Sequence, residues 1–202
     1  MNRNRQPEVN REYPREVQLQ DSVFKLRHMA RADRDAALSF ARALPRHDLL
    51  FLRRDITQPE VIDFWLNAID RGRIVSILAE SAGAVVGYAT VDLGELSWSP
   101  HVAELRVMVS PEVRGKGLGQ LLTQEAFAIA LGMGIEKMVA QMTADQKGAI
   151  DVFLGLGFRP EALLRDHVKD REGIKHDLVI MAHDVAKFHS QMEALGITRF
   201  RE

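Results

Sequence analysis

A short basic turn rich in glycine, residues 114–119, is the part of this sequence whose spacing most clearly suggests a chemical role. An apolar, strand-like run ends just before it, and an amphipathic pattern typical of a helix follows it. Amide groups at the start of a helix have no partner within the helix, and the helix dipole favours an anion there. Glycines let a phosphate approach the backbone, and Arg114 and Lys116 add positive charge. The turn therefore predicts an anion-binding site suited to a pyrophosphate.

Two familiar phosphate-binding patterns do not describe this turn. The G-x-x-x-x-G-K-[ST] pattern of a P-loop is absent, and the G-x-G-x-x-G pattern of dinucleotide-binding folds does not occur in it. A second block, residues 149–158, has an apolar helical pattern and ends in a Gly-Phe pair. This block follows a β-rich run at 137–142, so the chain repeats the order of strand, turn and helix.

Together these two blocks resemble the GNAT superfamily of acetyltransferases. The pyrophosphate signature of that family, [RQ]-x-x-G-x-[GA], matches Arg114, Gly117 and Gly119. A Val-Met-Val-x-Pro strand end precedes the signature, and an amphipathic helix follows it, as in the family. The resemblance covers roughly residues 22 to 183, and its specific motifs lie within 104 to 158.

The resemblance implies an α/β protein with the GNAT fold: a mixed central β-sheet of six to seven strands, flanked by helices and splayed between the fourth and fifth strands. It implies that acetyl-CoA is the co-substrate and that the acetyl group passes directly to a primary amine. The strand end before the turn would pair with the pantetheine arm, the Val109 amide would polarise the acetyl carbonyl, and the turn would bind the pyrophosphate. The cofactor-binding residues so implied are Val107, Met108, Val109, Val113, Arg114, Gly115, Lys116, Gly117, Leu118, Gly119, Gln146 and Phe153.

Glu104 is the candidate general base, because an amine must be neutral to attack a thioester. Its position ten residues before Arg114 resembles that of the catalytic glutamate in histone-type members of the family. In an alternating strand, Glu104, Arg106 and Met108 share one face. Two plainer interpretations stay open, in which Glu104 is solvated or is paired with Arg106.

Two positions depart from the family pattern. Many members have a tyrosine that donates a proton to the leaving thiolate, and this sequence has Phe153 there. Gln146 stands where an asparagine is frequent. Because phenylalanine has no proton to donate, the general acid is left open, and the alternative to an enzyme is a non-catalytic or degenerate acyl-CoA-binding regulatory module. The acceptor is also open between a protein lysine and a small-molecule amine.

The periodicity of apolar residues predicts the elements that position these motifs. Pro45 ends the first helix, and a four-residue turn at 81–84 joins two strands of a hairpin. Strands are expected at 22–29, 74–80, 85–93, 101–109, 137–142, 163–168 and 176–182. Helices are expected at 31–44, 59–71, 118–131, 146–155 and 185–195.

The composition narrows the classes of partner and site. The 202 residues fit one domain at 21–202, preceded by a polar N-terminal arm at 1–20. A net charge of -1 gives no general reason to expect nucleic acid or a membrane as partner, and a homodimer is compatible with it. No apolar run has the length of a membrane span and no signal-peptide pattern occurs, so the cytoplasm is the expected location. Without cysteine, disulfides and a cysteinyl acyl-enzyme are excluded.

A few other side chains have both a chemical and a plainer interpretation. Trp98 and His101 either line the acceptor site or belong to a structural loop. His167 and His176 lie on the two closing strands without an identifiable third ligand, so no metal is expected. Tyr88 is expected in the core or on the sheet surface, and Trp65 in the core or at the edge of the acceptor cleft.

Overall fold

A single eight-stranded sheet organises the computed structural model, which describes residues 12–49, 52, 54–94, 98–170 and 172–185. The strand order is β1-β2-β3-β4-β5-β6-β8-β7, and only β5 and β6 run parallel. The strands are β1 (Arg15–Leu19), β2 (Ser22–His28), β3 (Ile74–Ser81), β4 (Ala84–Asp92), β5 (Val102–Val109), β6 (Lys137–Thr143), β7 (Arg159–Lys169) and β8 (Lys175–Asp184). The predicted mixed α/β sheet is confirmed, with one strand more than the six to seven expected.

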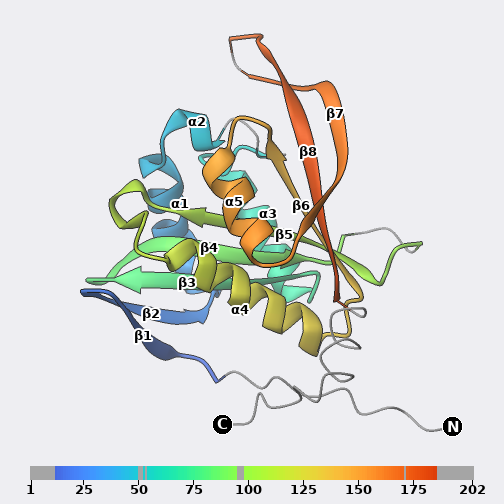
Figure 1. Ribbon diagram of the computed structural model, residues 1–202. Helices are drawn as coiled ribbons and strands as arrows, with labels where there is room; N and C mark the ends of the chain where they lie inside the picture. Colours follow the sequence, from blue (N-terminus) through green and yellow to red (C-terminus); the bar gives the residue numbers. More distant parts are fainter. Residues whose placement is uncertain (1–11, 50–51, 53, 95–97, 171, 186–202) are drawn as a thin grey trace, which may run out of the picture.

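Helices cover both faces of the sheet, and each face has its own core (Figure 1). One face packs against α4 and α5, with Leu122 and Phe158 fully buried. The other packs against α1 and α3, with Ile62 and Leu66 at its centre. The helices are α1 (Arg34–Ala43), α2 (Arg46–Leu49), α3 (Pro59–Asp70), α4 (Leu118–Gly132) and α5 (Lys147–Gly155), with short 3-10 turns η1 (Arg31–Asp33) and η2 (Pro111–Val113).

The central hairpin sets which side chains face which helices. Ala82 and Gly83 have positive φ values of 50° and 80°, the geometry of a tight hairpin turn that glycine favours. Across the next pair of strands, Tyr88 lies opposite Met108. Since side chains alternate along a strand, Met108 and its neighbours two and four residues back face α1 and α3. The predicted turn and the predicted alternation are both confirmed.

The N-terminal edge of the sheet differs from the expectation for the first 20 residues. Arg15–Leu19, within the segment expected to be a polar arm, forms β1 and pairs antiparallel with β2. Tyr13 and Arg15 donate hydrogen bonds to the carboxylate of Glu125, which is fully buried in α4. A buried carboxylate requires such partners, and sequence periodicity does not reveal them. Residues 1–11 lie outside the described residues.

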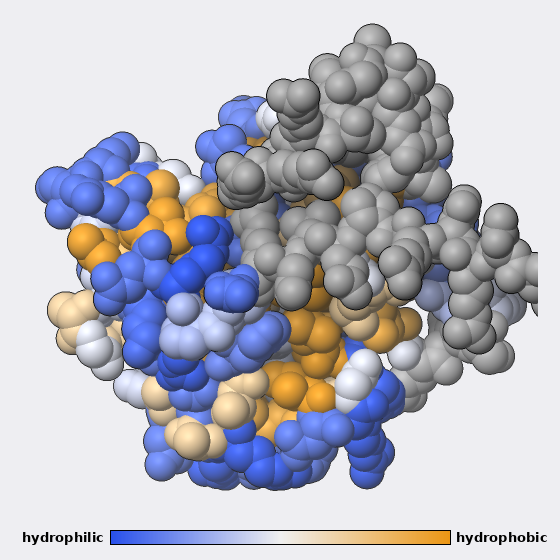
Figure 2. Space-filling model, turned by 90° about the horizontal axis from the view of Figure 1, so that it is seen from below, coloured by the Kyte–Doolittle hydropathy of each residue, from blue (hydrophilic) through white to orange (hydrophobic). Residues whose placement is uncertain are grey.

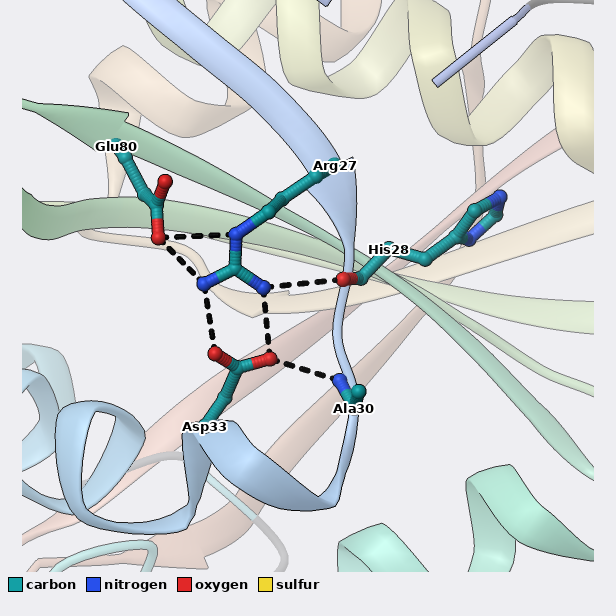
Figure 3. A network of polar contacts seen from close by, with 5 residues as sticks. All are labelled: Arg27, His28, Ala30, Asp33 and Glu80. Atoms are coloured by element: carbon teal, nitrogen blue, oxygen red, sulfur yellow. Dashed lines mark hydrogen bonds and ion pairs between the residues drawn. The ribbon is translucent and has the colours of Figure 1, made fainter. Parts of the chain in front are cut away.

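An arginine cluster joins β2 and β3 to the start of the helical layer (Figure 3). The Arg27 guanidinium donates to both oxygens of Asp33, at 2.6 and 2.8 Å, and to Glu80. Asp33 also accepts a hydrogen bond from the backbone amide of Ala30 at 2.8 Å. The hydrogen bonds from Arg27, and then that from Ala30, hold the pKa of Asp33 below its usual value.

The described part of the chain ends in a long antiparallel hairpin of β7 and β8, which extends outward from the body of the protein (Figure 1). The helix expected at 185–195 lies outside the described residues apart from its first residue. Seen from below, the surface shows apolar patches among hydrophilic residues (Figure 2). No helix in the described ranges is long and apolar enough to cross a membrane.

Candidate active site

The sheet opens between β5 and β6. The two strands pair only from Val102 to Glu104, opposite Lys137 to Val139, although both continue for several residues beyond. Past this point β6 remains paired with β8 along its whole length. The predicted splay is therefore confirmed between the two strands that were expected to form it, and Glu104 lies at its fork.

The backbone of β5 faces this gap at alternate residues. The backbone amide of Ser110 donates a hydrogen bond of 2.8 Å to the Val86 carbonyl of β4. Hydrogen-bonded and non-hydrogen-bonded residue pairs alternate along an antiparallel ladder, so the adjacent pair, Val109 with Gly87, is a non-hydrogen-bonded one. In an antiparallel ladder the N–H and C=O groups of such a residue point away from the partner strand. Val107 and Val109 therefore direct their peptide groups toward the gap. The Val109 carbonyl accepts hydrogen bonds from Arg114, whereas the Val107 groups and the Val109 amide fit a partner that pairs with the strand as pantetheine was expected to do.

Met108 plays a different part from its two neighbours. Its peptide groups face β4, and its side chain lines a cavity of about 100 Å³ in the gap, hereafter the splay cavity. The described residues that line this cavity are Asp48, Leu52, Glu104, Leu105, Arg106, Val107, Met108, Ala140, Gln141, Met142, Gln146, Ala149 and Phe153. The structure thus brings Glu104 together with Gln146 and Phe153, which belong to a later part of the chain.

Gln146 and Phe153 shape the far wall of the splay cavity. Gln146 precedes the first turn of α5, and its side-chain oxygen accepts a hydrogen bond of 3.1 Å from the Thr143 amide. Phe153 is almost completely buried and packs edge-on against Phe158, with ring centroids 4.9 Å apart. None of the described lining residues is a tyrosine, serine or cysteine, so a hydroxyl or thiol acid is absent from this set.

Glu104 is held by its neighbour on the same face of β5. Arg106 donates a hydrogen bond of 2.9 Å to a carboxylate oxygen of Glu104, and both side chains are only partly exposed. The pairing that the sequence left open is therefore present. It leaves Glu104 in the lining of the splay cavity, where a carboxylate can also accept a proton.

The glycine-rich turn has the backbone geometry of an anion-binding site. Gly115 and Gly117 have φ values of 76° and 88°, which glycine adopts without a steric penalty. Gly117 is the N-cap of α4, so the amides of the first turn of that helix point outward without helical partners. Val113 and Leu118 have buried side chains, so these two predicted residues offer only their backbone to a ligand.

The two cations of the turn also contact the protein itself. Arg114 donates two hydrogen bonds to the Val109 carbonyl, at 3.1 and 3.2 Å, and forms an ion pair with Asp48 of α2. Lys116 donates a hydrogen bond of 2.8 Å to Ser22 on β2. These contacts tie the turn to β5, α2 and β2, and the amides at the start of α4 are the part of the turn whose geometry suits an anion.

A larger cavity of about 510 Å³ lies on the α1 and α3 face and is called the acceptor cavity after the role that we propose for it below. Arg106 lines both this cavity and the splay cavity, so the two adjoin at β5. The lining residues are Arg54, Ile56, Val61, Phe64, Trp65, Ala68, Arg73, Ile74, Tyr88, Thr90, Asp92, Gly94 and Arg106. Its size is typical of sites for small ligands.

Comparison with known proteins decides the family. A family model described as the acetyltransferase (GNAT) family matches residues 37–158, more than half of the chain. The chain belongs to this GNAT acetyltransferase family. Its members transfer an acetyl group from acetyl-CoA to an amine, so this GNAT protein is an acetyl-CoA-dependent N-acetyltransferase. The turn at Gly117 and the gap at Val107 fit that co-substrate.

Three acetyltransferases illustrate what this GNAT enzyme is similar to. YwnH of Bacillus subtilis, provisionally named a phosphinothricin acetyltransferase, is 24% identical over 124 residues, 60% of this chain and 75% of YwnH. The L-methionine sulfoximine/L-methionine sulfone acetyltransferase of Pseudomonas paraeruginosa is 32% identical over 100 residues, 46% of this chain and 56% of that protein. The crystal structure of a Sinorhizobium meliloti phosphinothricin acetyltransferase with acetyl-CoA shares the fold, with a TM-score of 0.70 at 22% identity, over 80% of this chain and 88% of that one.

The structure places the side chains for which the sequence allowed both a chemical and a plainer interpretation. Trp98 and His101 are not among the described residues lining either cavity, and Trp98 is 82% exposed. His176 is bonded to Asp170 at 3.0 Å, and among the described residues no group of three His, Asp or Glu could hold a metal. Trp65 is both buried and part of the acceptor cavity wall, where it donates a hydrogen bond to Ser76.

Sequence reasoning missed the arginines of the acceptor cavity and Asp48 of the splay cavity. Arg54 and Arg73 lie at two separate places in the chain, after a loop and after a helix, and no motif includes them. The four-residue helix α2, which carries Asp48, is too short for a periodic signal. The one usable signal was the alternation of β5, which places Arg106 on the same face as Glu104.

Proposed function

We propose that this enzyme acetylates a small-molecule primary amine that enters through the acceptor cavity, with Glu104 as general base. The observation that carries the proposal is the position of Glu104. It occupies the last paired position before β5 and β6 separate, it lines the splay cavity, and its partner Arg106 lines both cavities. An amine in the acceptor cavity would therefore approach the splayed strands beside a carboxylate.

The residues of this chain would divide the binding of acetyl-CoA among three elements. Backbone amides at Gly117, Leu118 and Gly119, at the start of α4, would bind the pyrophosphate. The gap-facing peptide groups of Val107 would hold the extended arm. The Val109 carbonyl already accepts hydrogen bonds from Arg114, and the Val109 amide would polarise the acetyl carbonyl. When bound, acetyl-CoA supplies an activated acyl group on a thioester.

The proposed transfer balances as follows. The amine nitrogen forms a bond to the acetyl carbon, the carbon–sulfur bond breaks, and the amine proton goes to the carboxylate of Glu104. Phe153 lines the splay cavity and has no proton to donate. Solvent then supplies the proton of the leaving thiolate, and Arg106 offsets the negative charge that remains nearby.

A small-molecule acceptor is favoured over a protein lysine by two observations. The acceptor cavity is walled on several sides by α3, β3, β4 and β5, which suits a compact ligand better than a chain segment. The bacterial relatives from Bacillus and Pseudomonas are both named for small molecules. We place the reaction in the cytoplasm because acetyl-CoA is made and used inside the cell.

The test is a calorimetric titration of the protein with acetyl-CoA, followed by free-thiol release against a panel of amines. Saturable binding with amine-dependent thiol release is expected. Binding without release from any small amine, combined with acetylation of lysine-containing peptides, would contradict a small-molecule acceptor. Binding with no release from amines or peptides would favour the non-catalytic acyl-CoA module.

Substitution of Gly117 tests the pyrophosphate site separately. A glutamate there would place a negative charge at the start of α4, where the φ of 88° also disfavours a side chain. We expect affinity for CoA to fall about 100-fold or more, on the scale of losing several charge-assisted hydrogen bonds. Gly72→Glu is the matched control, since Gly72 has a similar φ of 68° and open space around it but lies at the end of α3. If Gly117→Glu and Gly72→Glu bind CoA with the same affinity, the pyrophosphate does not bind at the start of α4.

A further inference from the structure

We propose that the acceptor is an amino carboxylate, and that Arg54 and Arg73 bind its carboxylate at the mouth of the acceptor cavity. This rests on the proposed function, because it takes that cavity as the acceptor site. The chemical class includes free amino acids and their derivatives, in which one small molecule carries both an amine and a carboxylate.

The charge of the cavity wall is the first argument. Among the described residues that line the cavity, three carry a guanidinium group, Arg54, Arg73 and Arg106, and one carries a carboxylate, Asp92. Asp92 accepts a hydrogen bond of 2.9 Å from the Gly94 amide, and Arg106 is paired with Glu104. A polyamine would bring further positive charge into this wall and be repelled, whereas a carboxylate is attracted.

The arrangement of the arginines gives the cavity a direction. The guanidinium carbon of Arg54 lies 4.0 Å from the centre of the Phe64 ring, and that of Arg73 lies 6.0 Å from it. Phe64 is partly exposed, so this pair of cations marks the outer end of the cavity. Arg106 marks the inner end, where the splay cavity begins. A carboxylate at the outer end would leave the amine directed toward Glu104.

The chemistry of the outer end suits a carboxylate in particular. A guanidinium group presents a planar fork of donors that matches two carboxylate oxygens, and an aromatic ring beneath it fixes its orientation. Between the two ends, the buried side chains of Trp65, Ile74 and Tyr88 offer an apolar wall for the carbon skeleton of the ligand. The cavity therefore has one region for each part of an amino carboxylate.

The test compares amines that differ only in this group. The full-length protein is assayed by thiol release with L-methionine sulfone, L-glutamate and β-alanine, each beside its carboxamide. An α-carboxamide has the more acidic ammonium group and so presents more neutral amine, which favours the carboxamide unless the carboxylate is recognised. We expect kcat/KM to be about 10- to 100-fold higher for the acids, the range for a charge-assisted hydrogen bond. Equal or faster turnover of the carboxamides would overturn the proposal.

Substitution of Arg54 locates the recognition. Arg54→Gln should raise KM for the acids about 10-fold and leave KM for the carboxamides nearly unchanged. Arg71→Gln is the matched control, since Arg71 is exposed nearby but does not line the cavity. If Arg54→Gln changes KM for acids and carboxamides alike, or no more than Arg71→Gln does, the carboxylate is not bound there.

Direct binding separates this inference from the proposed function. If no amine on the panel is acetylated, the protein saturated with CoA is titrated with L-methionine sulfone and with its carboxamide. Binding of the acid alone, lost in Arg54→Gln, would support the carboxylate site although the proposed reaction had failed. No preference for the acid would overturn the inference.

Discussion

Two arginine–carboxylate clusters lie on the same face of the sheet, and they differ in what surrounds them. In the first, Arg27 bonds to Asp33, Glu80 and the His28 carbonyl, and Asp33 also takes the Ala30 amide. In the second, Arg106 donates one hydrogen bond to Glu104, and both residues line cavities.

The difference between these clusters indicates different roles. Each N–H group of the Arg27 guanidinium donates to an acceptor within the protein. Such a fully bonded arginine is typical of a structural role. The Arg106 cluster also pairs an arginine with a carboxylate, but Glu104 lines the splay cavity and Arg106 lines both cavities. A carboxylate bonded on all sides contributes to stability, whereas one that faces a cavity can exchange a proton with a ligand.

The largest expected effect concerns Glu104. Glu104→Gln removes the proton acceptor while keeping nearly the same shape, so we expect kcat to fall about 100- to 10,000-fold. CoA affinity and the free energy of unfolding should change little. Steady-state thiol release, calorimetry and urea unfolding of the same variant would measure the three quantities. If Glu104→Gln lowered the free energy of unfolding as much as Asp33→Asn does, the two clusters would not differ in their structural role.

The corresponding change in the first cluster is Asp33→Asn. It removes the charge that holds Arg27 and should lower the free energy of unfolding by roughly 2 kcal/mol, with kcat of the folded protein retained. Urea unfolding measures the loss. Asp35→Asn is the control, because the Asp35 side chain is 92% exposed in the first turn of α1, which Asp33 precedes, and its loss should change stability by less than about 0.5 kcal/mol.

The smallest expected effect is the pH dependence of the first cluster. Because Arg27 lowers the pKa of Asp33 in the folded state, the stabilisation is complete above the ordinary aspartate pKa of about 3.9. It should be lost as the pH falls from there through the folded pKa. The difference in unfolding free energy between wild type and Asp33→Asn should therefore become smaller as the pH is lowered from about 5 through the folded pKa of Asp33, because only one carboxylate is protonated. A constant difference over that range would show that Asp33 is not bonded as described.

The sequence predicted the active half of this fold better than its edges. Gly117, Glu104 and the splay lie in elements with strong periodicity and local turn chemistry, so the order of strand, turn and helix was recoverable. β1 was missed because its few apolar residues alternate within a polar segment, and a partner strand, together with Glu125 as partner for Arg15, stabilises it. Tertiary pairing of this kind is not encoded in local propensity.

The acceptor side could not be predicted for a related reason. Arg54, Phe64 and Arg73 come together only when α3 packs on the sheet, and each alone has the pattern of an ordinary surface or helix residue. The β5 alternation showed only that Arg106 shares a face with Glu104. Sites formed by a motif are readable from sequence, whereas sites formed by packing require the structure.

The most direct test of the central claim is the pH–rate profile of amine-dependent thiol release by the wild type and Glu104→Gln. If Glu104 accepts the amine proton, the wild-type rate should fall on the acid side as this base becomes protonated, in addition to the fall caused by protonation of the amine. Glu104→Gln should keep only the part that belongs to the amine. Profiles of the same shape in both proteins would contradict Glu104 as the base.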